Sequence, residues 1–136
     1  MKVFAMGGYG AVGSLATKLL AGNDLVTEIA IAGRNQGRAE KVAAEIGEKA
    51  IAVQADAKDE EKLISLLAGY DIIMNGARND SVVPVIRAAT RARTHYCDVN
   101  FRIEQALQLS SEAEATGITA IQTSVNMRGF TETTPK

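Results

Sequence analysis

The sequence predicts an α/β domain in which six parallel strands form a doubly wound sheet, in the order 3-2-1-4-5-6, with helices on both faces. Short continuous apolar runs alternate along the chain with segments of helical spacing, which is typical of a parallel sheet with crossover helices. A glycine-rich turn joins the first run to the first helical segment. The 136 residues, 46% of them hydrophobic, suffice for one domain that folds alone.

The first half of the chain is expected to contain three strands and two helices. Apolar runs predict the strands at residues 2–6, 26–32 and 50–54. The helices are expected at residues 11–21 and 36–46, and Gly22 and Gly47 terminate them. The apolar positions share one face of each helix: Val12, Leu15, Ala16 and Leu19 in the first, and Ala39, Val42, Ala43 and Ile46 in the second.

The second half repeats this alternation. Asp59 can cap a helix whose Leu63, Leu66 and Leu67 face inward, and Ser81 is a candidate cap for the next helix. Pro84 is tolerated there because it lies in the first helical turn, where no intrahelical bond is lost. The remaining expected elements are strands at 70–75, 94–99 and 118–122 and a helix at 103–116.

Ligands of a doubly wound sheet bind beyond the carboxyl ends of its strands. The loops expected there are Gly7 to Gly13, Gly33 to Asn35, Ala55 to Asp56, Asn75 to Asn79, and Asp98 to Phe101. Candidate binding residues are therefore sought in these segments.

The first of these loops, Gly7-Gly8-Tyr9-Gly10-Ala11-Val12-Gly13, has the spacing of a dinucleotide-binding turn. In such a turn the glycines permit a tight bend, a close approach of the backbone to a pyrophosphate, and close packing of helix on strand. Amide groups at the helix start then face the phosphates. The spacing fits Gly-x-Gly-x-x-Gly from Gly8 and Gly-x-x-Gly-x-x-Gly from Gly7, so the turn alone does not choose between two nucleotide-binding families.

The end of the second expected strand favours NADP over NAD. An NAD site usually has an Asp or Glu there for the ribose hydroxyl, whereas this chain has Ala32-Gly33-Arg34-Asn35. Arg34 offers a guanidinium that can bind a 2′-phosphate, and Arg38 could reinforce it one helical turn later. The alternative is that Arg34 is only a surface cation.

Composition excludes several classes of partner. Fifteen basic and sixteen acidic side chains give a formal charge of −1, which argues against nucleic acid. No apolar run approaches the roughly 20 residues that span a membrane. The single cysteine, Cys97, excludes an internal disulfide, and the first residues lack the architecture of a signal peptide. We therefore expect a cytoplasmic protein.

No residue is assigned as catalytic. His95, the only histidine, lies inside an expected strand and is interpreted as structural, as is Cys97, which has no activating partner. These residues and Asp98 lack a fourth convergent ligand, so no metal site is expected. No tyrosine has a lysine four positions later, which excludes the short-chain dehydrogenase type of catalysis. Tyr9 either covers the cofactor or is an exposed loop aromatic.

Further motifs occur outside the glycine turn: residues 28–34 (EIAIAGR), 53–56 (VQAD), 71–75 (DIIMN), 85–89 (VIRAA), 95–98 (HYCD) and 115–119 (ATGIT). With these motifs the chain, from the turn to about Thr123, resembles the N-terminal NADP-binding (Rossmann) domain of the saccharopine dehydrogenase-like oxidoreductases.

The resemblance implies a cofactor-binding set. Gly8, Gly10, Ala11, Val12 and Gly13 would line the pyrophosphate, Arg34 the 2′-phosphate, Asp56 and Ala57 the adenine, and Asn75, Gly76 and Ala77 the ribose and nicotinamide side, with Asp98 facing the nicotinamide region. Tyr9 and Asn35, from the same loops, complete the set. Asp56 has an alternative role as a turn residue, and Asp98 one in simple strand termination.

Two departures from the family pattern stand out. Relatives commonly have a glycine and a Pro-Gly pair after the sixth strand, where this chain has Val125-Asn126-Met127-Arg128-Gly129. Many relatives have an acid where this chain has Gly33, which strengthens NADP over NAD. Because family members continue into a substrate domain, we expect residues 1–124 to be the NAD(P)-binding domain and residues 125–136 to lead into an absent domain.

The resemblance implies one half of an enzyme that moves hydride to or from a C–N carbon of an amino-acid or polyamine-like substrate. The missing domain would bind this small-molecule substrate, so the isolated chain is expected to be inactive. A homodimer of the full-length protein is left open. The alternative is a single-domain NAD(P)-binding redox sensor or regulator without catalysis. Atypical relatives of the short-chain dehydrogenases have this role, and the spacing Gly7-x-x-Gly10-x-x-Gly13 fits their pattern.

Overall fold

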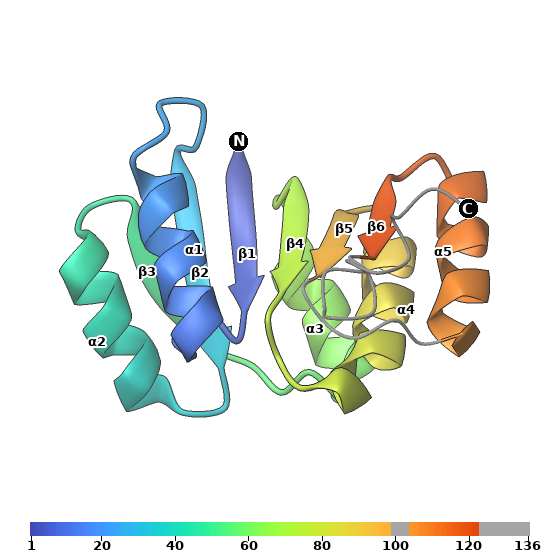
Figure 1. The fold of residues 1–136 in the computed structure, drawn as a ribbon, viewed down its shortest axis with the longest axis horizontal. Helices are drawn as coiled ribbons and strands as arrows, with labels where there is room; N and C mark the ends of the chain where they lie inside the picture. Colours follow the sequence, from blue (N-terminus) through green and yellow to red (C-terminus); the bar gives the residue numbers. More distant parts are fainter. Residues whose placement is uncertain (99–103, 123–136) are drawn as a thin grey trace, which may run out of the picture.

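The computed structural model describes residues 1–98 and 104–122, which form one six-stranded parallel sheet with flanking helices (Figure 1). In chain order the elements are β1 (Lys2–Met6), α1 (Ala11–Ala21), β2 (Glu28–Gly33), α2 (Gln36–Ile46), β3 (Ala50–Gln54), α3 (Glu60–Leu67), β4 (Ile72–Asn75), the short 3-10 helix η1 (Asn79–Ser81), α4 (Val82–Ala92), β5 (His95–Asp98), α5 (Glu104–Ala115) and β6 (Ala120–Gln122). Phe101 and the segment Val125 to Gly129 lie outside the described residues.

The strand order is β3-β2-β1-β4-β5-β6, and every neighbouring pair is parallel, which confirms the predicted topology. In this register Met6 lies opposite both Ala32 and Asn75, and Asn75 lies opposite Asp98. The carboxyl ends of β2, β1, β4 and β5 therefore form one continuous edge. The loops that follow these strands must meet at that edge.

Helices cover both faces of the sheet. On one face, α1 and α2 pack on a core that includes Val3, Ile29 and Ile31 (Figure 1). On the other face, α3, α4 and α5 bury a larger core around Phe4 and Ile73. Both layers were predicted, and both are confirmed.

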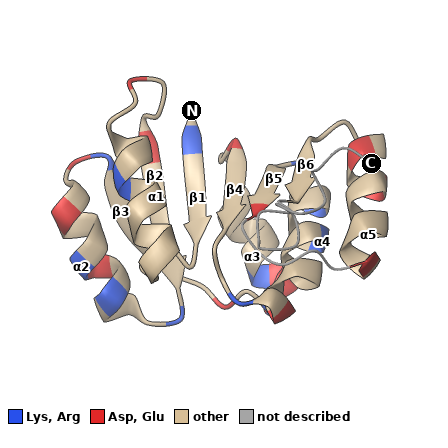
Figure 2. Cartoon of the chain, in the orientation of Figure 1, with Lys and Arg blue, Asp and Glu red and all other residues tan. Residues whose placement is uncertain are grey.

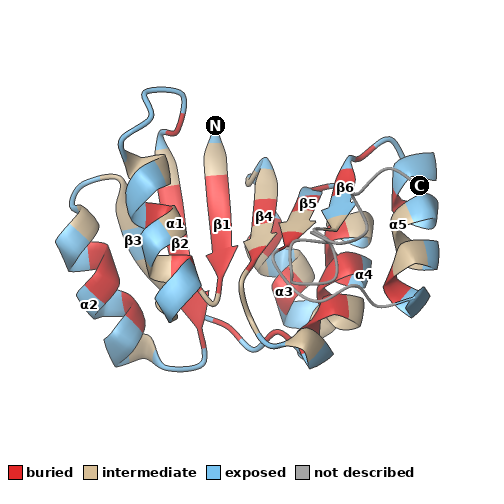
Figure 3. Cartoon of the chain, viewed as in Figure 1, coloured by how far each residue is buried: buried red, intermediate tan, exposed pale blue. Residues whose placement is uncertain are grey.

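The packing of α1 differs from the sequence pattern. Val12, Leu15 and Leu19, which share an apolar face, are 59%, 61% and 71% exposed. The buried residues of this helix are Gly13 and Thr17, and the partly buried Leu20 and Ala21 also pack on the core of this face (Figure 3). Small residues allow a closer approach of helix to strand than leucine would, and this approach decides which face is turned inward.

The boundaries of several strands also differ from the prediction. The second strand begins at Glu28 rather than Val26, and the fourth begins at Ile72 rather than Tyr70. The fifth and sixth strands are shorter by one or two residues at their described ends. The helices agree within a residue or two, because their polar and glycine boundaries are local signals.

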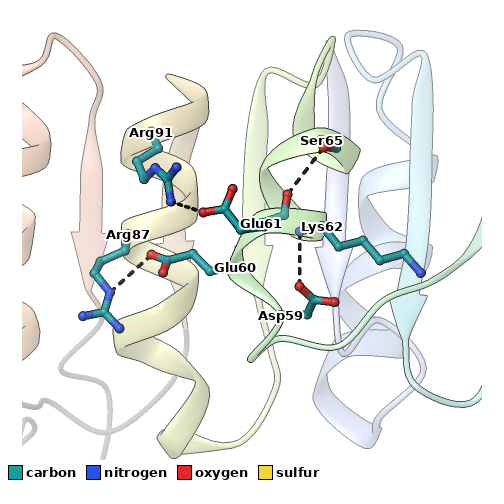
Figure 4. Close-up of polar contacts among 7 residues, drawn as sticks. All are labelled: Asp59, Glu60, Glu61, Lys62, Ser65, Arg87 and Arg91. Carbon is teal, nitrogen blue, oxygen red and sulfur yellow. Dashed lines mark hydrogen bonds and ion pairs between the residues drawn. The ribbon is translucent and has the colours of Figure 1, made fainter.

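The cap of α3 is as predicted, and the cap of α4 is not. Asp59 accepts a hydrogen bond from the backbone N–H of Lys62 at 3.3 Å (Figure 4). Ser81 precedes α4, but its hydroxyl makes no capping bond and instead donates to the backbone oxygen of Arg78. Its backbone is helical rather than extended, with φ −87° and ψ −14°, so its side chain does not adopt the usual cap geometry.

Ion pairs join α3 to α4 on the outer surface. Glu60 lies 3.3 Å from Arg87, and Glu61 lies 2.7 Å from Arg91 (Figure 4). Figure 2 shows charges of both signs on α2 and α3, and positive charges on α4. No helix among the described residues combines the length and hydropathy needed to cross a membrane.

Candidate functional site

A cleft of about 400 Å³ lies at the carboxyl edge of the sheet, where the loops after β1, β2, β3 and β4 meet. Seven of the fourteen predicted site residues line it: Tyr9, Gly10, Arg34, Asp56, Ala57, Gly76 and Ala77. Segments separated by more than 60 residues in the sequence thus form one concave site at the place that the topology predicts.

The glycines of the β1–α1 turn serve different purposes. A Cβ on Gly13 would lie 2.2 Å from the backbone oxygen of Gly7, and one on Gly7 would lie 2.8 Å from the backbone nitrogen of Ala77. Gly7 also has a φ of +73°, which favours glycine. A Cβ on Gly10 would meet nothing closer than 3.5 Å. The protein itself therefore requires Gly7 and Gly13, whereas Gly10 leaves space on the cleft side.

At the amino terminus of α1, the first backbone N–H groups have no backbone partner within the described part of the chain. The first hydrogen bond of this helix runs from the N–H of Ser14 to the oxygen of Gly10, at 2.8 Å. The amides of Ala11, Val12 and Gly13 precede that bond, and Gly10 supplies no side-chain cap. Helix starts of this kind attract phosphate through their free N–H groups and the helix dipole.

Two arginines lie near the end of β2, Arg34 directly after the strand and Arg38 in the first turn of α2. Among the described residues, neither Arg34 nor Arg38 takes part in an ion pair. The Arg38 guanidinium lies over the ring of Tyr9, 4.7 Å from its centroid. Both cations line the cleft and are exposed, which suits them to a phosphate dianion.

The ring of Tyr9 is held over Gly33. Its hydroxyl accepts a hydrogen bond from the N–H of Asn35 at 3.2 Å, and a Cβ on Gly33 would lie 2.3 Å from its Cε2. Of the two readings of Tyr9, the structure therefore favours a ring that forms part of the cleft. Asn35 itself caps α2 by accepting from the N–H of Arg38.

A comparison of the sequence with known protein families settles the family. The saccharopine dehydrogenase NADP-binding domain matches residues 3–121. The chain belongs to this family. The described cleft fits the cofactor, because Gly10 leaves space beside the start of α1 and the two arginines have no carboxylate partner among the described residues. The protein is thus an NADP-binding domain of the saccharopine dehydrogenase-like oxidoreductases, and its cofactor is NADP.

Solved structures with the same fold include three oxidoreductases. Apo saccharopine dehydrogenase (L-Glu forming) from Saccharomyces cerevisiae is 24% identical with a TM-score of 0.80, and the match covers 94% of this chain and 28% of that enzyme. The NADPH complex of an Escherichia coli quinone oxidoreductase is 20% identical (TM-score 0.65; 88% and 47% covered). A Veillonella parvula short-chain dehydrogenase/reductase in complex with NADP is 15% identical (TM-score 0.61; 88% and 67% covered).

The sequence did not single out several residues that line the NADP-binding domain's cleft. Lys58, Arg78 and Asp80 all do so. Lys58 lies 3.1 Å from Asp80 and holds the pKa of that carboxyl below its usual value. Asp56 accepts from the N–H of Lys58 at 2.9 Å, so it also has the turn role considered as its alternative. Arg78 lies inside the expected loop Asn75 to Asn79, whereas Lys58 and Asp80 directly follow predicted residues, and these positions were the only signal.

Asn75 and Asp98 lie behind the cleft of the NADP-binding domain. Neither is among the described residues that line it. Asn75 is 0% exposed and Asp98 is 6% exposed. Asn75 Oδ1 accepts from the N–H of Ala77 at 3.1 Å, and Asp98 accepts from the hydroxyl of Tyr96. In the described structure both residues therefore make hydrogen bonds within the protein rather than line the cleft.

His95 and Cys97 lie away from this cleft. His95 begins β5 and its Nδ1 accepts from the N–H of Thr119 at 2.9 Å, which is a structural role. Burial, with a smaller contribution from Asp98, raises the pKa of the Cys97 thiol, so it carries little thiolate. Both residues line a second hollow of about 560 Å³, with Ile72 and Ile121. No group of acidic, His and Cys side chains among the described residues could hold a metal ion.

Proposed function

We propose that the cleft binds NADP with its diphosphate at the start of α1 and its 2′-phosphate between Arg34 and Arg38, for hydride transfer to or from a C–N carbon. The observation that carries this proposal is the pair of arginines, which lacks an acidic partner in the described structure, beside Gly33. Bound NADP supplies hydride chemistry at its nicotinamide.

The arginines suit the 2′-phosphate for two reasons. A guanidinium forms charge-assisted, bidentate hydrogen bonds with phosphate oxygens, which are stronger than neutral ones. The absence of a carboxylate at Gly33 also removes the repulsion that an acid would exert on the phosphate. The Tyr9 ring fixes one face of the Arg38 guanidinium at 4.7 Å, so less freedom is lost when the phosphate binds.

The rest of the cofactor extends along the strand ends. The amides of Ala11, Val12 and Gly13 bind the diphosphate, and Gly10 admits it because no Cβ occupies the approach. We place the adenine beside Asp56 and Ala57, and the nicotinamide side beside Gly76 and Ala77.

The substrate belongs to a part of the protein outside this domain. The chain spans 28% of the yeast saccharopine dehydrogenase that it matches, which leaves room in such proteins for a substrate domain. We propose an amino-acid or polyamine-like substrate, residues 1–124 as the cofactor domain, and residues 125–136 as the lead into a substrate domain. The isolated chain then binds NADPH without turnover.

The test is a titration of NADPH and NADH by fluorescence with three variants. Arg34→Ala and Arg38→Ala each weaken NADPH binding about 10- to 100-fold and leave NADH nearly unchanged, because a hydrogen bond to a charged group contributes ~1.5–3 kcal/mol. Lys41→Ala is the control, since it removes one exposed positive charge from α2 outside the cleft. Undiminished NADPH affinity in both arginine variants, or an equal loss in the control, contradicts the proposal.

A further inference from the structure

We propose that Tyr96 and Asp98 are positioning residues: through Asn75 they hold the turn at residues 75–78 against the glycine turn and so shape the nicotinamide side of the cleft. This inference rests on the proposed function, because it concerns the same cleft. Neither side chain needs to touch the cofactor.

Four polar side chains are buried together at the ends of β4 and β5. Asn75, Tyr96, Ser81 and Asp98 are 0%, 1%, 3% and 6% exposed. Asn75 Nδ2 lies 3.3 Å from the Tyr96 hydroxyl and 3.2 Å from the Ser81 hydroxyl. Buried polar groups stabilise a fold only when they are hydrogen-bonded, and their mutual bonds make a specific arrangement obligatory.

The hydrogen bonds of this cluster indicate which of its groups donate and which accept. Tyr96 donates its only hydroxyl proton to Asp98, so its oxygen accepts from Asn75. Burial raises the pKa of Tyr96, with a further contribution from Asp98, so the hydroxyl keeps that proton. The Ser81 hydroxyl lies 2.5 Å from the oxygen of Arg78 and 3.4 Å from Asn75 Oδ1, so the shorter contact is the one to which it donates, and it accepts from Asn75 Nδ2.

The orientation of the Asn75 amide follows from these donors. Among the described residues, Nδ2 donates to the two hydroxyls, and Oδ1 accepts from the N–H of Ala77 at 3.1 Å. A rotated amide would place an N–H against that N–H. Asp98 therefore controls the backbone at Ala77 through Tyr96 and Asn75.

The turn that is held in this way forms a wall of the cleft. Gly76 and Ala77 line it, and they pack so closely on the glycine turn that a Cβ on Gly7 would lie 2.8 Å from atoms of both. The N–H of Gly76 also donates to the oxygen of Met6 at 2.8 Å. A rotation of the peptide at Ala77 would thus change the space beside the glycine turn.

The experiment compares two ligands on two matched variants. Tyr96→Phe removes the hydroxyl that links Asp98 to Asn75. Tyr70→Phe is the control, because Tyr70 also donates to a carboxylate, Glu28 at 2.6 Å, but lies at the amino end of the sheet. NADPH spans the whole cleft, whereas 2′,5′-ADP lacks the nicotinamide arm. Affinities are measured by titration at a temperature where all variants are folded by circular dichroism.

We expect Tyr96→Phe to weaken NADPH about tenfold, or ~1.4 kcal/mol at 25 °C, and to leave 2′,5′-ADP within twofold of wild type. Tyr70→Phe should leave both ligands unchanged. Asp98→Asn retains an acceptor for the tyrosine proton, so this single variant should bind NADPH more tightly than Tyr96→Phe does and nearly as tightly as wild type. It also serves as the second variant if Tyr96→Phe does not fold, and an affinity for NADPH more than tenfold below wild type would then count against the inference.

The outcomes separate this inference from the proposed function. If wild type binds neither NADPH nor 2′,5′-ADP, the proposed cleft is wrong. If wild type binds both and Tyr96→Phe binds NADPH equally well, or loses both ligands in parallel, the positioning role is wrong while the cleft stands.

Discussion

The same glycine-to-alanine substitution should have opposite effects on the stability of this domain at two of its glycines. Gly13→Ala and Gly37→Ala both place a methyl group in the first turn of a helix, in α1 and α2. At Gly13 the new Cβ would lie 2.2 Å from the backbone oxygen of Gly7 and 3.0 Å from the Cα of Gly8. At Gly37 the nearest atom is Asn35 Oδ1 at 3.6 Å, an ordinary contact.

The expected magnitudes follow from these distances. Relief of the clash at Gly13 moves α1 away from its turn, and overpacking of this kind costs about 1–3 kcal/mol. The higher helix propensity of alanine offsets up to about 1 kcal/mol of that loss. Gly37→Ala has no clash and should stabilise the domain by about 0.4–1 kcal/mol, largely through the unfolded state. The two variants should therefore differ by about 2 kcal/mol.

Gly10→Ala separates the fold from the ligand. The new Cβ would have no neighbour closer than 3.5 Å. The free energy of unfolding should therefore fall by no more than about 1 kcal/mol, because alanine is a poorer helix cap than glycine. NADPH affinity should nevertheless fall at least about tenfold, since the methyl group occupies the approach of the diphosphate. Urea unfolding followed by circular dichroism measures stability, because the chain has no tryptophan.

The reasoning is refuted if Gly13→Ala is as stable as Gly37→Ala, since the close contact of α1 with Gly7 would then not exist. It is also refuted for the ligand if Gly10→Ala binds NADPH as tightly as wild type. A difference of 1 kcal/mol corresponds to about 3–5 °C in Tm for a domain of this size, so thermal melting provides an independent measurement.

Three further predictions concern the fold and the site. Leu15→Ala, on the exposed face of α1, should change the free energy of unfolding by less than about 0.5 kcal/mol, whereas Leu63→Ala in the core should cost about 2–5 kcal/mol; a core-sized loss at Leu15 in urea unfolding would show that α1 is turned the other way. Gly33→Asp should displace the Tyr9 ring and raise the ratio of NADPH Kd to NADH Kd at least about tenfold, and an unchanged ratio in fluorescence titrations would contradict the assignment. Because burial raises the pKa of Cys97, iodoacetamide should alkylate it more slowly in the native protein than in urea at pH 7.5, as followed by mass spectrometry; equal rates would oppose this reading.

Local signals explain most of what could be predicted. Glycine and Asx residues at helix ends are read from a few neighbouring residues, so the limits of α1, α2 and α3 were close to correct. The order of the sheet followed from the alternation of strands and helices, because right-handed crossovers restrict the topology. Seven of the predicted site residues meet in the cleft for the same reason: the topology brings strand ends together.

Contacts between distant residues explain what could not be predicted. The ring of Tyr9 lies over Gly33, 24 residues away, and no local pattern marks that pair. Asn75 and Tyr96 are hydrogen-bonded across neighbouring strands, which the register of β4 and β5 alone makes possible. The inward face of α1 depended on its close approach to the β1–α1 turn rather than on its apolar period.

The sequence by itself determined the doubly wound sheet and the choice of NADP, since each of these depends on residue types at fixed local spacing. The tertiary structure alone decided that Gly7 and Gly13 are required by close contacts within the protein, while a Cβ on Gly10 would meet no atom closer than 3.5 Å. It also decided that Tyr96 and Asp98 are linked to the cleft through Asn75. The physical reason is that steric contact and hydrogen bonding act over a few ångströms in space, whatever the separation along the chain.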